Sequence, residues 1–376
     1  MPKPRTWLLL AEKVGDNAQV EALASGLPWP CEIRRLQMKP EWLLAKPAVR
    51  STLDHIDLDQ SDALEPPWPD LIVTMGRRTS SAALWIQDRS EGRTRIVLVG
   101  KPSGHWDRMG LIVGSAEILL PPLPNVLKIR LPLLRIERSR VTRAADDWRA
   151  RFSELPRPLV AVLVGGPTRP FVYDASVTRR LVEIAERVAD DGGTPFITTS
   201  RRTPTALADA LEVELPKAAR FHRWQPGAPL EDNPYLGLLG LADGFVVTAD
   251  SASMVVEVAS LGRPLGILRL PGGRLGSLEF ARRRMLHRLF EPARGGAFDA
   301  LRCLVARAAF RTRLLWASRD FRVLYEWLVA EGFAVWAGEP LVSPPRPLPD
   351  ERERVACRVE MLVPSEIEGS VGTPPV

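Results

Sequence analysis

The chain has 376 residues, a length that fits two domains. Its residues are 45% hydrophobic and 26% charged, a composition typical of a globular protein rather than a disordered one. No apolar run approaches the ~20 residues of a membrane span. Three scattered cysteines form neither a disulfide framework nor a metal site, so we expect a cytoplasmic protein with no metal and no bound cofactor.

The net charge of +6 comes almost wholly from arginine, because the chain has only seven lysines. Arginine suits phosphates and anionic membrane surfaces, so peripheral attachment to the inner face of a membrane stays open, although a GC-rich genome explains the bias equally well. No nucleic-acid-binding motif accompanies the charge, and nucleic acid is not expected as a partner.

The N-terminal part alternates strand-like and helix-like segments. Strands are expected at 5–13, 31–38, 69–76, 94–100 and 110–114, and helices at 19–27 and 80–89. This alternation predicts a parallel sheet built from βαβ units.

A charged helical stretch at 131–157 predicts a connection between domains, and a second alternating series of strands and helices follows it. From about Ala281 the pattern becomes helical and rich in arginine. We therefore expect an α/β protein with two doubly wound Rossmann-like domains that face each other across a cleft. The expected boundaries are 1–135 for the first domain, 136–157 for the connection, 158–335 for the second domain and 336–376 for a flexible tail.

Two similar tetrapeptides, GRRT and SRRT, each follow a strand and open a helical pattern, one in either half. Thr203 and the proline after it are expected to begin a helix as N-cap and first residue. Adjacent arginines repel each other unless an anion or a carboxylate lies between them. The two turns therefore predict anion-binding corners or solvated basic loops; their residues are Gly76, Arg77, Arg78, Thr79, Ser200, Arg201, Arg202 and Thr203.

Two further motifs follow strands in the second half. Gly165 and Gly166 permit a tight turn close to a ligand, and the amides that follow them could hold phosphate oxygens; the alternative is a plain turn. Asp250 ends a buried strand, and Ser251 or Ser253 is expected to cap the next helix, which also holds Met254. Glu257 lies in that helix among valines and needs a partner, either the vicinal hydroxyls of a ribose or an arginine.

Near the N-terminus, Gly15, Asp16, Asn17 and Gln19 predict a short polar loop after the first strand. Such a loop could hold a sugar or an acceptor group. Together with the turn at 76–79, it would place a second polar site in the N-terminal half.

The segments "PDLIVTMGRRTSSAALW", "VLVGGPT", "ITTSRRTPTALADAL", "VVTADSASMVVEVASLGRP" and "LYEWLVAEGFA" resemble the mitochondrial-fission family named for elongated mitochondria. The likeness covers roughly residues 5 to 335. Many bacterial members of that family are labelled nucleoside-diphosphate-sugar epimerase-like. The family is similar in turn to glycosyltransferases of the two-domain GT-B fold and to the non-hydrolysing sugar 2-epimerase.

This resemblance implies that the C-terminal half binds a nucleotide sugar. Gly165 and Gly166 would match the loop at the diphosphate, Ser251 to Ser253 the diphosphate-side turn, and Glu257 the ribose ligand. The chain departs from the family at 101–103, which reads Lys-Pro-Ser, and at 115–117, which reads Ser-Ala-Glu, where members usually carry other polar residues. His105 and Asp107 have the chemistry of a substitute base.

Three functions remain open at this stage. The first is metal-independent transfer of a sugar from a nucleotide donor to a lipid-linked or envelope-related acceptor, with Asp16, His105 or Asp107 as base. The second is epimerisation of a nucleotide sugar. The third is a non-catalytic scaffold at a membrane surface that keeps the fold.

Overall fold

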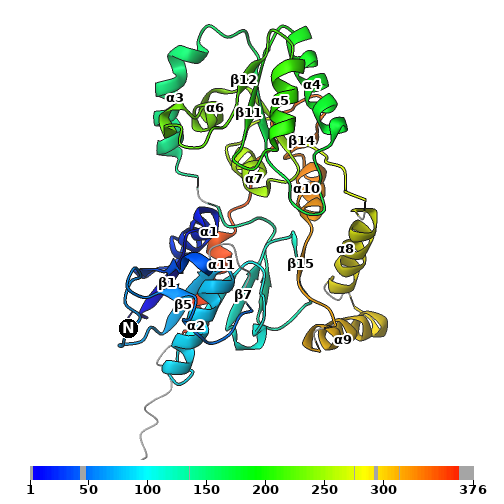
Figure 1. Ribbon diagram of the computed structural model, residues 1–376. Helices are drawn as coiled ribbons and strands as arrows, with labels where there is room; N and C mark the ends of the chain where they lie inside the picture. The colour runs from blue at the N-terminus through cyan, green and yellow to red at the C-terminus, as the bar shows by residue number, and fades with distance from the viewer. Residues whose placement is uncertain are drawn as a thin grey trace, which may run out of the picture. The chain divides into compact units, whose positions relative to one another are not determined.

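The computed structural model describes residues 3–42, 48–134, 136–274, 276–291, 295–312 and 314–363. The chain divides into two compact units, each made of more than one segment. Unit 1 comprises 1–135, 289–319 and 350–376, and unit 2 comprises 136–288 and 320–349. Each unit is an α/β structure around its own parallel sheet, as predicted (Figure 1).

Unit 1 contains a six-stranded parallel sheet with the order β2-β1-β5-β6-β7-β9. Its strands are β1 (Thr6–Leu10), β2 (Glu32–Arg35), β5 (Leu71–Met75), β6 (Arg95–Val99), β7 (Leu111–Gly114) and β9 (Val126–Lys128). Two short antiparallel pairs lie beside it: β3 (Gln37–Met38) with β4 (Ile56–Asp57), and β8 (Ile118–Leu119) with β15 (Ser318–Arg319). Its α-helices are α1 (Val14–Ala24), α2 (Arg77–Arg89), α9 (Ala297–Arg311) and α11 (Arg352–Glu360).

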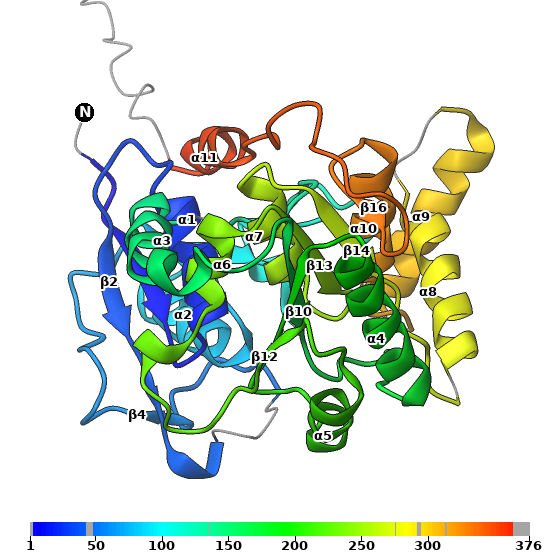
Figure 2. The ribbon, with the colours of Figure 1, turned by 90° about the horizontal axis from the view of Figure 1, so that it is seen from above.

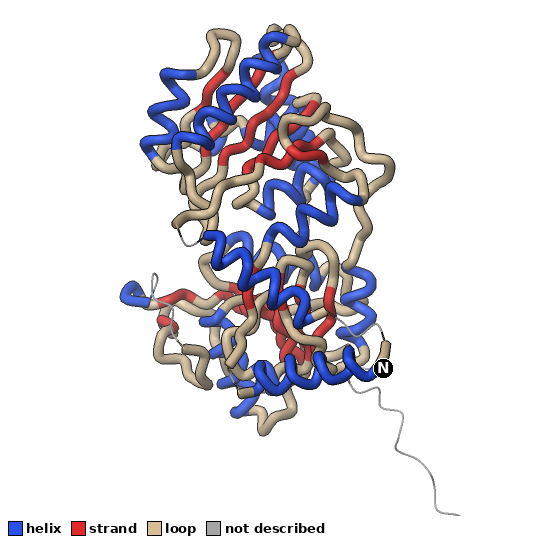
Figure 3. Tube along the Cα trace, turned by 90° about the vertical axis from the view of Figure 1, so that its right-hand side faces the viewer, coloured by secondary structure: helices blue, strands red, loops and turns tan. Residues whose placement is uncertain are grey.

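Unit 2 contains a second six-stranded parallel sheet with the order β12-β11-β10-β13-β14-β16. Its strands are β10 (Leu159–Val164), β11 (Thr194–Thr199), β12 (Arg220–His222), β13 (Gly244–Thr248), β14 (Leu265–Leu268) and β16 (Val335–Trp336). Its helices are α3 (Arg138–Phe152), α4 (Ala175–Asp190), α5 (Thr205–Glu214), α6 (Tyr235–Leu241), α7 (Ala252–Ser260), α8 (Gly276–Phe290) and α10 (Phe321–Ala330); the last two residues of α8 belong to unit 1. Figures 2 and 3 show helices lying along the strands of each sheet.

The stretch from 136 to 157, expected to be a connection, is part of unit 2. Its helix α3 packs against α6, where two glycines permit a close approach. A Cβ at Gly237 would lie 2.6 Å from Cγ of Trp148, and one at Gly240 would lie 2.6 Å from Cβ of Ala145. The charged surface of α3 concealed this contact in the sequence, because only a few of its residues are buried.

Two parts of the segment expected to be a flexible tail form regular structure instead: Trp336 ends strand β16 (Val335–Trp336), and 352–360 forms helix α11. Strand β16 pairs with β14, and helix α11 packs against α1 and buries Val355, Ala356 and Val359 in the core cluster of unit 1. The Glu351 carboxylate accepts a 2.8 Å hydrogen bond from the Arg130 backbone amide. Three small apolar residues were too weak a signal in a segment rich in proline and charge, and residues 364–376 of the expected tail lie outside the described residues.

Candidate functional site at the strand ends of unit 2

The strand order of unit 2 reverses direction between β10 and β13, which makes their carboxyl ends the topological switch point. In open parallel sheets, ligands bind at this position, beyond the strand ends. The predicted segments at 165–166, 200–203 and 250–257 follow β10, β11 and β13, respectively. Hydrogen bonds join the residues at 165–166, 200–203 and 250 into one cluster.

The Gly165–Gly166 loop lies against the Asp250 side chain. Gly165 donates a 2.8 Å hydrogen bond from its amide to Thr248 Oγ1, and Gly166 donates one of 2.8 Å to Asp250 Oδ2. A Cβ at Gly165 would lie 2.2 Å from Asp250 Oδ2, so only glycine fits there. Both glycine amides already have acceptors within the protein, so neither is free for a phosphate oxygen.

Asp250 is a buried carboxylate with several donors. Tyr173 donates to Oδ1 at 2.5 Å and the Thr248 hydroxyl donates to the same oxygen at 2.7 Å. Burial raises the pKa of Asp250, while the bonds from Tyr173, Thr248 and Gly166 oppose that rise. Asp250 therefore organises the strand ends, and its acceptor oxygens are engaged within the protein.

The SRRT segment forms a turn before the helix rather than its first residues. Helix α5 begins at Thr205 with Pro204 at the N-cap position, so the predicted capping role of Thr203 is wrong. The Thr203 hydroxyl instead donates to the Gly165 carbonyl at 2.6 Å and accepts from the Ser200 amide at 2.8 Å. This threonine fastens the turn to the neighbouring strand end.

The two arginines of this turn have different surroundings. Arg202 donates to Thr168 Oγ1 at 3.0 Å and lies 3.7 Å from Asp250 Oδ2 in an ion pair. The side chain of Arg201 is exposed and forms no ion pair with any described residue. One carboxylate therefore neutralises one of the two guanidinium groups, and Arg201 is available to an anion in solution.

Helix α7 begins beside this cluster. Ser251 occupies its N-cap position without a side-chain hydrogen bond to the helix, and Ser253 is exposed in its first turn, followed by half-buried Met254. Ser251 is therefore at the predicted N-cap position, but its hydroxyl forms no capping bond. The positive end of α7 is consequently uncapped by a side chain and can accept a negatively charged group.

Glu257 lies on α7 and pairs with α6. The Tyr235 hydroxyl donates to Glu257 Oε2 at 2.5 Å, so the partner inside the protein is a tyrosine rather than the arginine considered from the sequence. Burial raises the pKa of Glu257, and the tyrosine bond opposes that rise. Among the described residues no hydrogen bond reaches Oε1, which leaves this oxygen for a ligand hydroxyl.

Polar residues of unit 1

The switch point of unit 1 lies between β1 and β5. Gly15, Asp16, Asn17 and Gln19 do not form the expected loop there, because helix α1 already begins at Val14. Asn17 donates from Nδ2 to the Ala11 carbonyl at 2.6 Å and accepts from the Ala11 amide at 3.1 Å. Its amide group therefore ties the helix to the end of β1 and is not free for a sugar.

Asp16 lies close to the arginine turn of this unit. Its Oδ2 is 3.9 Å from Lys13 Nζ and would be 3.5 Å from a Cβ placed on Gly76. Burial raises the pKa of Asp16, against the opposing charges of Lys13 and Arg319. Asp16 can therefore hold a proton at higher pH than an exposed aspartate.

The GRRT segment differs from its counterpart, because Arg77 and Arg78 are the first two residues of α2. Gly76 has a φ of 103° at the N-cap, which favours glycine. The Thr79 hydroxyl donates to the Met75 carbonyl at 2.7 Å within the same segment. Arg78 lies 3.8 Å from Glu12 in an ion pair, so a carboxylate neutralises one arginine here too.

A pocket of about 550 Å³ in unit 1 contains two of the predicted catalytic residues, His105 and Asp107. His105 lies at the start of a short 3₁₀ turn with a φ of 48°. Arg77, Lys101 and Arg311 line the same pocket, which gives it a basic character, whereas Asp16 does not line it. The arrangement suits a ligand that carries negative charge.

Glu117 is a buried acid beyond the end of β7 that the sequence did not identify as a site residue. Ser115 donates to its Oε1 at 2.7 Å, and among the described residues Oε2 has no hydrogen-bond partner. Burial raises its pKa, opposed by Ser115 and by the charge of Arg319. The Ser-Ala-Glu sequence at 115–117 therefore does place a titratable group near the strand ends of unit 1.

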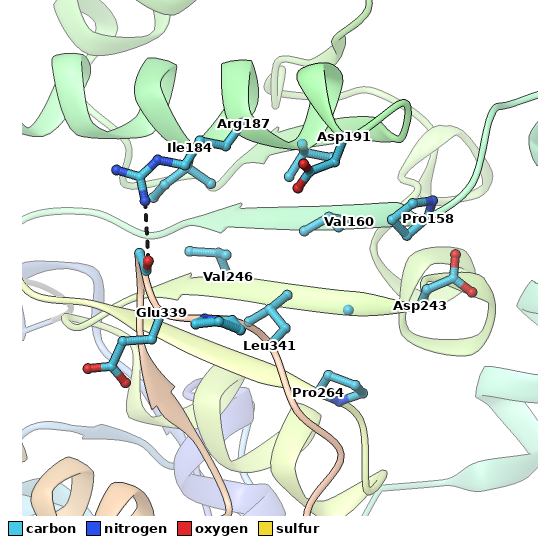
Figure 4. A pocket seen from close by; sticks show the side chains of 14 residues that line it. Pro158, Val160, Ile184, Arg187, Asp191, Asp243, Val246, Pro264, Glu339 and Leu341 are labelled. Atoms are coloured by element: carbon cyan, nitrogen blue, oxygen red, sulfur yellow. Dashed lines mark hydrogen bonds between the residues drawn. The ribbon is translucent and has the colours of Figure 1, made fainter.

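A separate cavity of about 470 Å³ lies in unit 2, between α4 and the segment 338–341. Figure 4 shows Pro158, Val160 and Pro264 lining it near the amino ends of the strands, with Arg187 donating to the Gly338 carbonyl at 3.2 Å. None of the predicted site residues lines this cavity. It belongs to the end of the sheet away from the switch point.

The site contains partners that the sequence analysis missed. Tyr235 lies in "NPYLGLL" and Tyr173 follows the glycine loop, and each donates to a carboxylate that follows strand β13. Since the chain has only three tyrosines, two of them beside predicted ligand motifs were a usable signal. Within the described residues, no group of three or more His, Cys, Asp or Glu side chains could hold a metal ion.

Relationship to known proteins

The model of the family "Mitochondrial fission ELM1" matches residues 14–290, nearly three-quarters of the chain. The chain therefore belongs to the mitochondrial fission ELM1 family. It is 27% identical over 226 residues to "Mitochondrial fission protein ELM1" of Arabidopsis thaliana, covering 54% of this chain but only 52% of that protein. It is 24% identical over 301 residues to "Uncharacterized protein RP120" of Rickettsia prowazekii, covering 70% of this chain and 83% of that protein.

Among solved structures, the UDP-GlcNAc 2-epimerase of Methanocaldococcus jannaschii has 14% identity and a TM-score of 0.42, covering 73% of this chain and 86% of that chain. A glycosyltransferase of Rickettsia africae has 9% identity and a TM-score of 0.44, covering 88% of this chain and 98% of that chain. The epimerase and glycosyltransferase activities are properties of those two proteins. No helix among the described residues has the length and apolar character needed to cross a membrane.

Proposed function

We propose that the switch point of unit 2 binds a nucleoside-diphosphate sugar and that the protein transfers the sugar to a lipid-linked or envelope-related acceptor without a metal. The cluster of the 165–166 loop, the 200–203 turn and Asp250 carries this proposal. Three segments distant in sequence converge there beside an uncapped helix end. Such convergence is typical of a ligand site at the ends of parallel strands.

The donor would contact three kinds of group. Arg201 and the first turn of α7 would hold the diphosphate, because the glycine amides are engaged by Thr248 and Asp250. Glu257 Oε1 would accept from a ribose hydroxyl while Tyr235 fixes the carboxylate through Oε2. Arg201 and the dipole at the start of helix α7 would stabilise the departing diphosphate electrostatically.

The acceptor would enter the basic pocket of unit 1. His105 is its candidate base, with Asp107 beside it in the chain. Asp16, at the switch point of unit 1, is the other candidate, because its raised pKa suits proton transfer. A sugar epimerase would use the same donor site, so nucleotide binding alone is common to both reactions.

A thermal-shift panel tests the donor site. The wild type is melted with UDP, GDP, dTDP and CMP and with their common sugar conjugates, in parallel with Glu257→Gln. Glu186→Gln is the matched control, because Glu186 is exposed on α4 of the same unit. A nucleotide present at 100 times its dissociation constant adds about 2.7 kcal/mol of stability to the wild type and to the control.

Loss of the shift in Glu257→Gln alone supports the donor site and identifies the nucleotide. A wild type that melts cooperatively and shifts with no nucleotide refutes the proposal. In that case the remaining hypothesis is a non-catalytic scaffold. It is supported by the hydrogen bonds that Asn17 and both loop glycines form within the protein.

A further inference from the structure

Nearly half of the large apolar side chains exposed in the described part of the chain lie in one short segment. Of thirteen large hydrophobic residues exposed among the described residues, six lie between positions 298 and 316. They are Phe298, Leu301, Leu304, Val305, Leu314 and Trp316, and Phe298 is 81% exposed. Single exposed apolar residues need no explanation, whereas a contiguous group of this size marks an interaction site.

Helix α9 carries four of these residues and has two apolar faces. Its inner face buries Cys303, Ala306 and Phe310, and Phe310 contacts Phe290 and Trp106 in unit 1. Its outer face is exposed over more than two turns, and from Ala297 to Ala308 it contains no ionisable side chain; its residues there are Ala297, Phe298, Ala300, Leu301, Leu304, Val305 and Ala308. A helix with only a core to cover would have a polar outer face.

The surroundings of this face are basic. Between positions 289 and 319 the sequence has six arginines and two acidic residues, a local charge of +4 within a chain of +6. Arg302 and Arg307 flank the outer face and bond backbone carbonyls of unit 1, and Arg311 is exposed at the end of the helix. Positive charge beside an apolar helix face is complementary to an anionic lipid bilayer.

We propose that α9 lies flat on an anionic membrane surface, with Phe298, Leu301, Leu304 and Val305 inserted among the lipids. Trp316 lies at the level of the headgroups, where indole rings are favoured. A second copy of the chain or a protein partner would gain less from the arginines, because the same positive charge would repel a copy of itself. The proposal does not depend on the sugar-transfer reaction.

The position of Trp316 connects this surface with the basic pocket. Trp316 and Arg311 belong to the exposed segment and also line the pocket that contains His105. A protein held on the membrane by α9 would therefore open this pocket beside the lipid headgroups. This placement suits an acceptor that is itself anchored in the membrane.

Vesicle flotation tests the inference. The full chain is mixed with vesicles of phosphatidylcholine alone, or of phosphatidylcholine with phosphatidylglycerol, and the floating fraction is measured. The test variant is Leu301→Gln with Leu304→Gln, both exposed, and the matched control is Leu58→Gln with Val213→Gln, which removes two exposed apolar residues elsewhere.

We expect binding to the anionic vesicles only, and weaker binding at high salt. The test variant lowers the partition coefficient about a hundredfold, roughly tenfold for each side chain, while the control stays within twofold of wild type. Arg311→Gln lowers the partition coefficient about fivefold, because it removes one positive charge.

Three outcomes overturn the proposal. The wild type fails to float with anionic vesicles, or the test variant floats as well as the control. In the third, the wild type is a dimer by analytical ultracentrifugation without vesicles and the test variant is a monomer, which assigns the face to a second copy of the chain.

Discussion

The two arginine turns have nearly the same sequence but different structures. In unit 1 the arginines begin helix α2, and Thr79 bonds within its own segment. In unit 2 the turn precedes α5, and Thr203 fastens it to the end of the neighbouring strand β10. The second turn is therefore an integral part of the strand-end cluster, whereas the first is local.

In both turns, nevertheless, one of the two arginines is neutralised by a carboxylate. The second arginine of each turn lies near a carboxylate that follows another strand, Arg78 near Glu12 and Arg202 near Asp250. A pair of arginines is thus no sufficient evidence for a phosphate. The case for an anion in unit 2 depends on Arg201 and on the uncapped start of α7.

The largest expected difference concerns two glycines: Gly76, which lies in the first turn, and Gly166, which lies in the loop packed against the second. Gly166→Ala would bring a Cβ within 2.1 Å of the Arg202 carbonyl oxygen, so we expect a loss of about 3 kcal/mol in unfolding free energy. Gly76→Ala faces only an unfavourable φ and should cost about 1–2 kcal/mol. Calorimetric melting measures both, with Gly15→Ala as a control that meets no neighbouring atom within 4 Å. Equal losses at positions 166 and 76 would contradict the tight contact.

The threonines provide the next comparison. Thr203→Val leaves the Ser200 amide and the Gly165 carbonyl without their partner, which should cost about 2 kcal/mol. Thr79→Val removes a local bond to Met75 and should cost about 1 kcal/mol. Melting temperatures of the two variants test the order, and a larger loss at Thr79 would show that the turn of unit 2 is not fastened through Thr203.

The pH dependence of stability isolates Glu257. Burial raises its pKa above the usual 4.5, so the folded state retains the proton to a higher pH than the unfolded chain does. Its ionisation therefore costs stability as the pH rises from about 4.5 towards the raised value. Compared with Glu257→Gln, the wild type should lose melting temperature over that range. Parallel melting curves for the two proteins would mean that the pKa of Glu257 is not raised.

The smallest effect on stability is expected at Arg201. Arg201→Gln should leave the melting temperature unchanged, because the side chain is exposed without an ion pair to any described residue. We expect it to lower nucleotide affinity about tenfold by calorimetric titration. Arg179→Gln, exposed on α4, serves as control, and Arg77→Gln in the other turn should not change the affinity. An unchanged affinity in Arg201→Gln would remove this arginine from the proposed site.

Local sequence patterns predicted much of the fold, because each buried strand is a short apolar run between turn residues. They predicted the strands "LIVTM" and "LVAVLV" and the helix that carries Glu257. Contacts distant in sequence could not be predicted. Helix α11 joins the core of unit 1, and 289–319 also belongs to that unit, although each lies far from the first 135 residues in the chain.

The candidate site was predictable in its residues but not in its bonds. The sequence identified Gly165, Gly166 and Asp250 as strand-end residues. It could not indicate that Asp250 accepts from a glycine amide and from Tyr173, because those bonds depend on the pairing of β10 with β13. The same limit applies to Glu257, whose partner lies on a different helix.

Hydrogen–deuterium exchange with and without a saturating nucleoside diphosphate tests the central claim most directly. If the ligand binds at the switch point of unit 2, exchange slows at 200–203 and at the first turn of α7, and it does not change at 76–80 in the other turn. Slower exchange at 76–80 with none at 200–203 or 252–255 would place the ligand in unit 1 and contradict the account.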